Sequence, residues 1–177
     1  MQTEVALSLG GNTGDVPLYF RRALKKLRDG GLCEVRISSL YRTAPVGCAK
    51  GMPDFINAAV TGKWKSSLDS LHRLCMKIEI EEGRPANHVK YASRTLDLDI
   101  VFFGDTVYSD SRITVPHSEA RHRLFVLIPL AEIAGDKIFP GQKMTVGEIL
   151  EKRSRETEFK DISKTKFQVN RQDMNRT

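Results

Sequence analysis

The chain has 177 residues, of which 40% are hydrophobic and 28% are charged, and its net charge is +6. This composition excludes a disordered or fibrous protein, and the length is sufficient for one domain whose core needs no disulfide or metal. No apolar run approaches the roughly 20 residues that span a bilayer, and the first residues lack the pattern of a secretory signal. Because the three cysteines are odd in number and not closely paired, we expect a reducing, cytoplasmic location.

The positive charge is unevenly distributed along the chain. From residue 151 onward, eight basic and five acidic residues carry half of the net charge in a segment of low hydrophobicity. A basic protein can bind nucleic acid, an anionic membrane surface or a small anionic ligand. We predict one domain over residues 1–152, followed by a charged C-terminal tail over 153–177.

The first elements are predicted from hydrophobic alternation and from capping residues. Residues 5–9 alternate and lead into Gly10-Gly11-Asn12-Thr13-Gly14, which predicts a strand and a tight turn. A helix capped by Asp15 should then cover about residues 16–28. Its buried stripe is predicted to consist of Phe20, Ala23, Leu24 and Leu27.

Further elements are predicted from apolar periodicity and boundary residues. Strands are predicted at 35–43, 55–64 and 96–103, with a hairpin partner for the last at 107–108. One helix should begin at about residue 68, with Ser66 and Asp69 as its capping box. A further helix is predicted at 124–133, which Pro129 should break or kink, and a short one follows Thr145 and Glu148, its capping box, and runs through 152. This order of strands and helices indicates a single α+β domain.

Two acids in the predicted strand 96–103 are the most informative feature of the sequence. Alternation along a strand places Asp97 and Asp99 on one face. Paired carboxylates can hold metal ions roughly 3.5–4 Å apart, and oxygen ligands favour Mg²⁺, which takes waters and phosphates as its other ligands. The spacing alone is equally compatible with a solvated edge strand, but two acids in an otherwise apolar run favour a site.

Basic loops flank this strand on both sides. Residues 84–94 carry three permanent positive charges, and residues 114–125 carry Arg121, Arg123 and two histidines. Arginine side chains bind phosphate oxygens with two parallel hydrogen bonds, so the combination favours chemistry on a magnesium-bound nucleotide. The glycine-rich turn lacks the features of a P-loop or a Rossmann fingerprint, and the histidines lack zinc-ligand spacing with the cysteines.

Several motifs together resemble one family, the 6-hydroxymethyl-7,8-dihydropterin pyrophosphokinases of folate biosynthesis. The resemblance extends from Val5 to about Leu150. It rests on Leu9-Gly10-Gly11-Asn12, Tyr41-Arg42-Thr43-Ala44-Pro45, Pro53-Asp54-Phe55-Ile56-Asn57-Ala58, Gly83-Arg84, Arg94-Thr95-Leu96-Asp97-Leu98-Asp99-Ile100, Val115-Pro116-His117 and Arg123-Leu124-Phe125-Val126-Leu127. The block that contains the two acids is the most specific of these.

The resemblance implies a fold, a reaction and a set of ligands. The implied fold is a ferredoxin-like α+β sandwich with a mainly antiparallel sheet covered by helices. The implied reaction transfers pyrophosphate from ATP to the hydroxymethyl group of the pterin and releases AMP, with two Mg²⁺ ions held by Asp97 and Asp99. ATP and hydroxymethyl dihydropterin are then the partners of a monomeric, cytoplasmic enzyme that binds neither nucleic acid nor membrane.

The same resemblance implies roles for individual residues. The catalytic set is Arg84, Arg94, Asp97 and Asp99. The pterin is expected to contact Thr43, Ala44, Pro45, Val46, Phe55, Asn57, Tyr91 and Phe125, with stacking between Phe55 and Phe125. The nucleotide is expected to contact Glu79, Arg84, Arg94, Ile100, Arg112, Thr114, His117 and Arg123. The sequence departs from the family pattern at Gly11, Ala44, Ala86, Tyr91 and Ser93.

Two other functions are weighed against this one. A relative that binds pterin or nucleotide without catalysis would not need both Asp97 and Asp99, whereas the chain retains them. A nucleic-acid-binding protein could use the basic residues of helix 16–28 or of the tail. However, a helix with one buried face usually carries such charges for solvation, and the tail has few aromatic side chains that could stack on bases.

Overall fold

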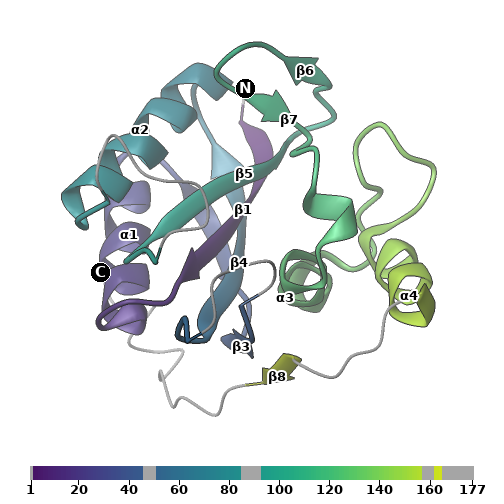
Figure 1. The fold of residues 1–177 in the computed structure, drawn as a ribbon. Helices are drawn as coiled ribbons and strands as arrows, with labels where there is room; N and C mark the ends of the chain where they lie inside the picture. The colour runs from purple at the N-terminus through teal and green to yellow at the C-terminus, as the bar shows by residue number, and fades with distance from the viewer. Residues whose placement is uncertain (1, 46–50, 85–92, 157–161, 165–177) are drawn as a thin grey trace.

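The computed structural model describes residues 2–45, 51–84, 93–156 and 162–164. For residues 162–164 it describes the backbone only. A six-stranded antiparallel sheet, in the order β5-β1-β4-β3-β8 with β2 also paired to β4, forms its centre. Helices α1 and α2 cover one face, and α3 covers the other with α4 packed beside it (Figure 1). This arrangement confirms the predicted α+β sandwich with an antiparallel sheet.

The boundaries of the elements agree closely with the sequence patterns in most places. The strands are β1 (Thr3–Gly11), β2 (Cys33–Ile37), β3 (Tyr41–Thr43), β4 (Phe55–Trp64), β5 (Asp97–Phe103), β6 (Tyr108–Ser109), β7 (Thr114–Val115) and β8 (Ile162–Lys164). The helices are α1 (Val16–Asp29), α2 (Leu68–Glu81), a short 3-10 helix (Ala120–His122), α3 (Leu124–Ala134) and α4 (Val146–Glu156).

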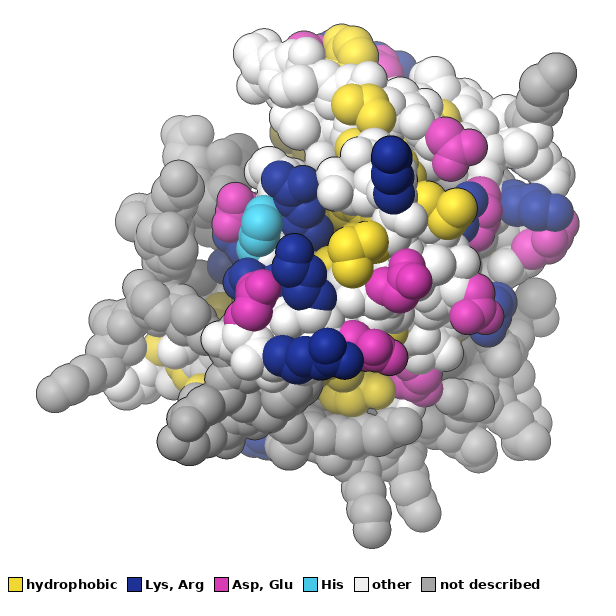
Figure 2. Space-filling model, turned by 90° about the vertical axis from the view of Figure 1, so that its right-hand side faces the viewer, with side chains coloured by type: hydrophobic (Ala, Val, Ile, Leu, Met, Phe, Trp, Pro, Cys, Tyr) yellow, Lys and Arg dark blue, Asp and Glu magenta, His cyan; other side chains and the backbone are white. Residues whose placement is uncertain are grey.

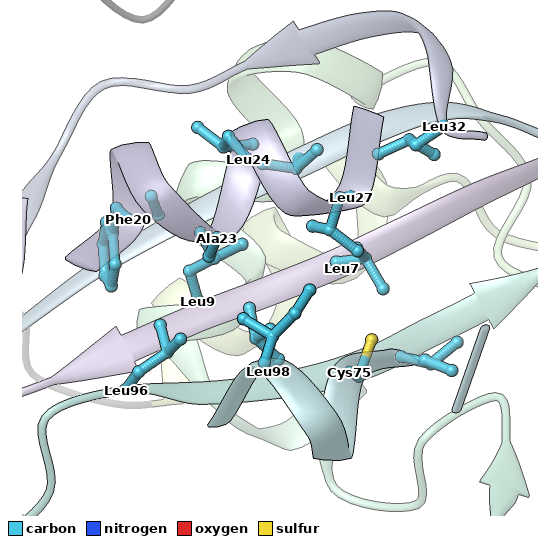
Figure 3. Packing of buried hydrophobic residues seen from close by; sticks show 14 of the residues in the cluster. Leu7, Leu9, Phe20, Ala23, Leu24, Leu27, Leu32, Cys75, Leu96 and Leu98 are labelled. Carbon is cyan, nitrogen blue, oxygen red and sulfur yellow. The ribbon is translucent and has the colours of Figure 1, made fainter. Parts of the chain in front are cut away.

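Helix α1 shows why an amphipathic sequence folds onto the sheet. The carboxylate of Asp15 accepts a hydrogen bond from the backbone N–H of Leu18 at 3.0 Å, which confirms the predicted cap. The buried residues of the helix include the predicted set Phe20, Ala23, Leu24 and Leu27. Figure 3 shows this stripe against Leu7 and Leu9 of β1. Burial of such side chains is the main source of stability in a domain of this size.

The two faces of strand β1 carry side chains of different size. Val5, Leu7 and Leu9 belong to the core under α1 and α2. Ala6 belongs to the second core, under α3 and α4, and alternation places Ser8 and Gly10 on the same side as Ala6. The face that meets α3 is therefore lined by short side chains along β1, which allows the helix to pack closely over Ala6.

The second core is closed by α3 and α4. Pro129 lies inside α3 without breaking the helix, which corrects part of our expectation. Thr145 and Glu148 form the predicted capping box, because Thr145 N–H donates to Glu148 Oε2 at 2.7 Å and Glu148 N–H donates to Thr145 Oγ1 at 3.2 Å. Helix α4 continues to Glu156, beyond its predicted end.

The predicted strand 35–43 is divided into β2 and β3, and contacts made by two serines explain the division. Ser38 N–H donates to the carbonyl of Ala59, and Ser38 Oγ accepts a hydrogen bond from Ala59 N–H. The backbone N–H of Ser39 then donates to Glu132 of α3 at 2.9 Å and is lost to the sheet. The strand resumes only at Tyr41.

Two local predictions are wrong for reasons that involve distant or competing partners. The cap of α2 is Ser67, whose Oγ accepts from Ser70 N–H at 3.2 Å, and Asp69 pairs instead with Arg73 and Arg112. Residues 107–108 do not form a hairpin with β5, because β6 pairs with β7. The turn between them is closed by Asp110, which accepts hydrogen bonds from the backbone N–H groups of Arg112 and Ile113 at 2.8 Å each.

The last described segment adds a strand to the sheet. Strand β8 pairs with β3 in antiparallel register, with Thr43 opposite Ile162 and Tyr41 opposite Lys164. The division into a domain over 1–152 and a tail stays a prediction, although this part of the expected tail contacts the sheet. Over the described ranges, no helix combines the length and apolar character needed to cross a bilayer.

We predict that Phe20→Ala destabilises the protein by about 3–5 kcal/mol, because the side chain is fully buried and its removal leaves a cavity. Urea unfolding followed by circular dichroism would measure the change. Lys25→Ala on the exposed face of the same helix is the control, and its ion pair with Asp29 is worth less than about 1 kcal/mol. Equal losses for the two variants would contradict the packing described for α1.

Candidate functional site

The register of three strands brings polar side chains from distant segments to one place. Gly10 of β1 lies opposite Asn57 of β4 on one side and opposite Asp97 of β5 on the other. A Cβ added at Gly10 would lie 3.4 Å from Asn57 Oδ1 and 3.8 Å from Asp97 Cβ, so both side chains flank the bare glycine. Two residues along, Ser8 lies opposite Asp99. Asp97 and Asp99 therefore share the face of the sheet that also meets α3, as the alternation predicts.

Two arginines converge on the first of the acids. Arg84 Nη1 donates to Glu79 Oε1 and to Asp97 Oδ1, and Arg94 Nη1 donates to Asp97 Oδ2 at 2.6 Å. The side chains of Arg84, Glu79 and Asp97 are only 13%, 13% and 18% exposed. Both oxygens of Asp97 thus accept from guanidinium groups, and these partly buried, charge-assisted bonds are stronger than surface ion pairs.

Glu79 links this group to the backbone of β5. Its Oε1 also accepts a hydrogen bond from Leu98 N–H at 2.7 Å. Burial, together with the nearby charges of Asp97 and Asp99, raises the pKa of Glu79 to about 7, although the Leu98 N–H and Arg84 act in the opposite direction. Three acids, Glu79, Asp97 and Asp99, therefore lie close together at this site.

Asp99 differs from Asp97 in its contacts. Within the described part of the chain, no residue donates a hydrogen bond to its carboxylate or forms an ion pair with it. Burial and the charge of Asp97 raise the pKa of Asp99, while His117, Arg84 and Arg123 act on it from a distance in the opposite direction. A partly buried carboxylate without a direct partner is costly, and a bound cation would relieve that cost.

The donor set fits a magnesium ion that takes most of its ligands from elsewhere. Among the residues described, no three His, Cys, Asp or Glu side chains converge into a metal-binding group. Mg²⁺ is usually bound by one or two carboxylates together with waters and substrate phosphates. Asp97 and Asp99 supply carboxylates of this kind, next to arginines that suit phosphate.

Aromatic rings lie directly beside the charged group. The guanidinium of Arg94 lies 5.6 Å from the ring centroid of Phe55, and that of Arg123 lies 5.7 Å from the centroid of Phe125. Arg94 therefore touches both an acid and an aromatic side chain. A flat ligand on the aromatic rings and an anionic ligand on the arginines would be neighbours.

Asn57 is oriented by a second buried side chain. Its Nδ2 donates to Thr43 Oγ1 at 2.9 Å, and both residues are buried. Because this bond uses the amide nitrogen, Oδ1 remains directed toward the space above Gly10. Ala44 and Pro45 continue the chain from this point without regular structure.

Asn12 connects the loops around the site. The sequence does not predict this role, although Asn12 belongs to the motif Leu9-Gly10-Gly11-Asn12. Its Oδ1 accepts from Arg94 N–H at 2.8 Å, and its own N–H donates to the Arg94 carbonyl at 2.9 Å. Its Nδ2 donates to the Pro53 carbonyl and to Ser93 Oγ. A Cβ at Gly11 would lie 2.4 Å from the Thr95 carbonyl oxygen, so this close approach requires glycine.

The structure does not bring every predicted site residue to the acid pair. Arg112 is 62% exposed and bonded to Asp69 and Asp110, Thr114 shares a hydrogen bond with Ser109, and the side chain of Ile100 is in the core under α1 and α2. Val46 and Tyr91 lie outside the described residues. The roles assigned to all of these positions stay predictions.

Charge is mixed on the face of the protein that Figure 2 shows. Lys and Arg side chains alternate there with Asp and Glu, so this face presents no continuous basic surface among the described residues. Several of the pairs lie on α4, where Arg153 bonds Glu156 and Arg155 lies near Glu151. This pattern gives no support to a nucleic-acid interface on that side.

A small antiparallel α+β domain with paired acids, adjacent arginines and aromatic rings suits the transfer of a phosphoryl group to a flat heterocycle. Comparison with known proteins agrees: residues 6–135 match the family described as 7,8-dihydro-6-hydroxymethylpterin-pyrophosphokinase (HPPK). The chain belongs to this family.

Individual relatives are similar over most of the chain. The 2-amino-4-hydroxy-6-hydroxymethyldihydropteridine pyrophosphokinase of Synechocystis sp. is 38% identical over 146 residues, which cover 82% of this chain and 73% of the relative. The protein of that name in Bacillus subtilis is 39% identical, with coverage of 72% and 75%. The mitochondrial folate synthesis bifunctional protein of Arabidopsis thaliana is 39% identical over 76% of this chain, but the match spans only 24% of that longer protein.

Solved structures show the same fold. One is the crystal structure of Plasmodium falciparum HPPK-DHPS with pteroate, which matches with a TM-score of 0.67 over 89% of this chain and 46% of that chain. Its sequence identity is 14%, so the likeness is one of fold alone.

We predict that Thr43→Val destabilises the protein by about 1–3 kcal/mol, because valine keeps the shape but leaves the buried amide of Asn57 without its acceptor. Thr43→Ser retains the hydroxyl and is the matched control. Urea unfolding of the two variants would measure the difference between their free energies of unfolding. Equal stability of valine and serine would show that the bond does not hold the amide.

Proposed function

We propose that the chain transfers the terminal diphosphate of ATP to the hydroxymethyl group of 6-hydroxymethyl-7,8-dihydropterin and releases AMP. The observation that carries this proposal is the arrangement around Asp97, whose two oxygens are bonded to Arg84 and Arg94. Asp99 lies beside it with no direct partner among the described residues. Membership in the pterin pyrophosphokinase family supports the same reaction. In this reaction the pterin hydroxyl oxygen bonds to the β-phosphorus, the bond from that phosphorus to the AMP oxygen breaks, and the hydroxyl proton is released.

Asp97 and Asp99 are proposed to hold two Mg²⁺ ions, which supply charge neutralisation and orientation for the phosphates when bound. Arg84 and Arg94 are proposed to stabilise the negative charge that develops during transfer. Their bonds to Asp97 hold the guanidinium groups near the place where the phosphates would bind, and these bonds would be exchanged for phosphate and metal contacts when the ligands arrive. The expected nucleotide contacts of Glu79, His117 and Arg123 agree with their positions around the acid pair.

The pterin is proposed to lie between Phe55 and Phe125, because flat heterocycles stack favourably on aromatic rings. The bond of its nitrogen to Thr43 leaves the oxygen of Asn57 directed toward Gly10, where it can accept a hydrogen bond from an N–H group of the pterin. The protein's contribution to rate is then mainly alignment of the hydroxymethyl oxygen with the β-phosphorus.

We expect the full chain, given ATP, Mg²⁺ and 6-hydroxymethyl-7,8-dihydropterin, to form AMP and the pterin diphosphate in equal amounts. Chromatography of the nucleotides and pterins would measure both products. Formation of ADP would indicate a different kinase reaction. Tight binding of pterin or nucleotide without AMP would instead identify a binding protein that has lost catalysis.

Asp97→Asn is expected to lower kcat on the order of 10²–10³-fold or more, because it removes a proposed metal ligand and weakens the bonds that hold both arginines. Pterin affinity, measured by calorimetry without ATP, should stay near that of the unchanged protein. Asp105→Asn, which changes an exposed acid just beyond the same strand, is the control. A wild-type turnover number for Asp97→Asn would rule out the metal role.

A further inference from the structure

A partly buried cluster of hydrogen bonds joins α3 to strand β3 outside the group described above. Glu132 Oε2 accepts from Ser39 N–H at 2.9 Å and from the hydroxyl of Tyr41 at 2.8 Å. Its Oε1 accepts from Ser39 Oγ at 2.8 Å. Both oxygens of one helix carboxylate are therefore bonded to the short segment where β2 ends and β3 begins.

The two elements that this cluster joins, β3 and α3, both carry residues of the proposed pterin site. Tyr41 lies opposite Asn57 in the sheet, and Thr43, two residues further along β3, lies opposite Phe55. On the helix, Glu132 follows Phe125 by seven residues, which is close to two turns, so the two side chains lie on the same side of α3 about 10 Å apart along its axis. The cluster thus joins the helix that carries one stacking ring to the strands that carry the other.

The remaining contacts of α3 do not fix its position as strictly. Leu127, Leu130 and Ile133 pack in the second core, partly against Ala6 and Ala59, and such contacts are non-directional. Hydrogen bonds to a carboxylate are directional and strong when charge-assisted. Three of them at one side chain define both the rotation of the helix and its height above the sheet.

The chemistry of the cluster is suited to a permanent connection. Burial raises the pKa of Tyr41 to about 12, and the hydrogen bond to Glu132 contributes to the increase. The phenol therefore remains protonated and continues to donate at any physiological pH. The cluster of Glu132, Ser39 and Tyr41, here termed the brace, is therefore a permanent connection and not a pH-dependent switch.

We propose that Glu132 is a positioning residue for the pterin site, which holds Phe125 at the correct distance and angle from Phe55 and Asn57. This inference rests on the proposed function for its substrate. It assigns Glu132, Ser39 and Tyr41 an influence on pterin affinity, although none of them belongs to the expected contact set. Nucleotide binding depends on the acid pair and the arginines, and the brace leaves it unaffected.

The test compares the variants Glu132→Gln and Tyr41→Phe with Asp136→Asn, which changes an exposed acid just beyond α3. Glutamine is neutral, so the bonds from Ser39 N–H and Tyr41 lose their charge assistance, and the Ser39 hydroxyl must turn to accept from the new amide. We expect Glu132→Gln to raise the KM and the calorimetric Kd for the pterin about tenfold, equivalent to about 1.4 kcal/mol, with KM for ATP unchanged. Tyr41→Phe removes one bond and should produce a smaller increase in the same direction, while Asp136→Asn should leave all constants unchanged.

Melting temperature, measured for each variant, separates positioning from stability. A lower melting temperature for Glu132→Gln with unchanged pterin KM and Kd would overturn the proposal, since a purely structural brace predicts that result. If Glu132→Gln fails to fold, the milder Tyr41→Phe decides the question by the same two constants. Pterin Kd is measured without ATP, so it tests the brace even if the unchanged protein forms no AMP, a result that would count against the proposed function alone.

Discussion

The site depends on the unequal faces of strand β1. Large side chains at Val5, Leu7 and Leu9 anchor the strand to α1 and α2, while Ala6, Ser8 and Gly10 leave the other face nearly bare. Because β1 lies between β4 and β5, its short side chains allow Asn57 and Asp97 to face each other across Gly10. Polar side chains of two flanking strands can meet in the middle of a sheet only where the central strand contributes no bulk.

The charges around Gly10 suit a cationic ligand and an anionic one together. Asp97 is bonded to Arg84 and Arg94, and Glu79 to Arg84 and the Leu98 N–H. Asp99 has no direct partner among the described residues, and burial raises its pKa. A buried carboxylate without a partner destabilises the folded state. Metal ions brought in with a polyphosphate would satisfy the acids, and the phosphates would satisfy the arginines. The acids are thus explained by bound metal ions and the arginines by bound phosphates, so the two ligands have to be considered together.

Much of the fold follows from patterns that act over a few residues. The stripe of α1, the limits of β4, and the common face of Asp97 and Asp99 depend on periodicity alone, and the sequence predicts them correctly. The division between β2 and β3 could not be predicted, because it depends on Ser39 bonding to a helix more than 90 residues away. The role of Asn12 was missed for the same reason, since its partners lie near residues 53 and 94. Local composition contains no signal for partners that only the folded chain brings together.

Helix α3 links the two halves of the proposed site. Arg123 and Phe125 stand at its start, where one is expected to contact the nucleotide and the other the pterin, and the guanidinium lies over the ring. On the opposite wall, Arg94 repeats the arrangement, because it bonds Asp97 and lies over Phe55. Each of these two arginines thus lies where the expected nucleotide and pterin surfaces meet. The helix that carries one of the pairs is attached to the sheet near its other end, through the hydrogen bonds of Glu132.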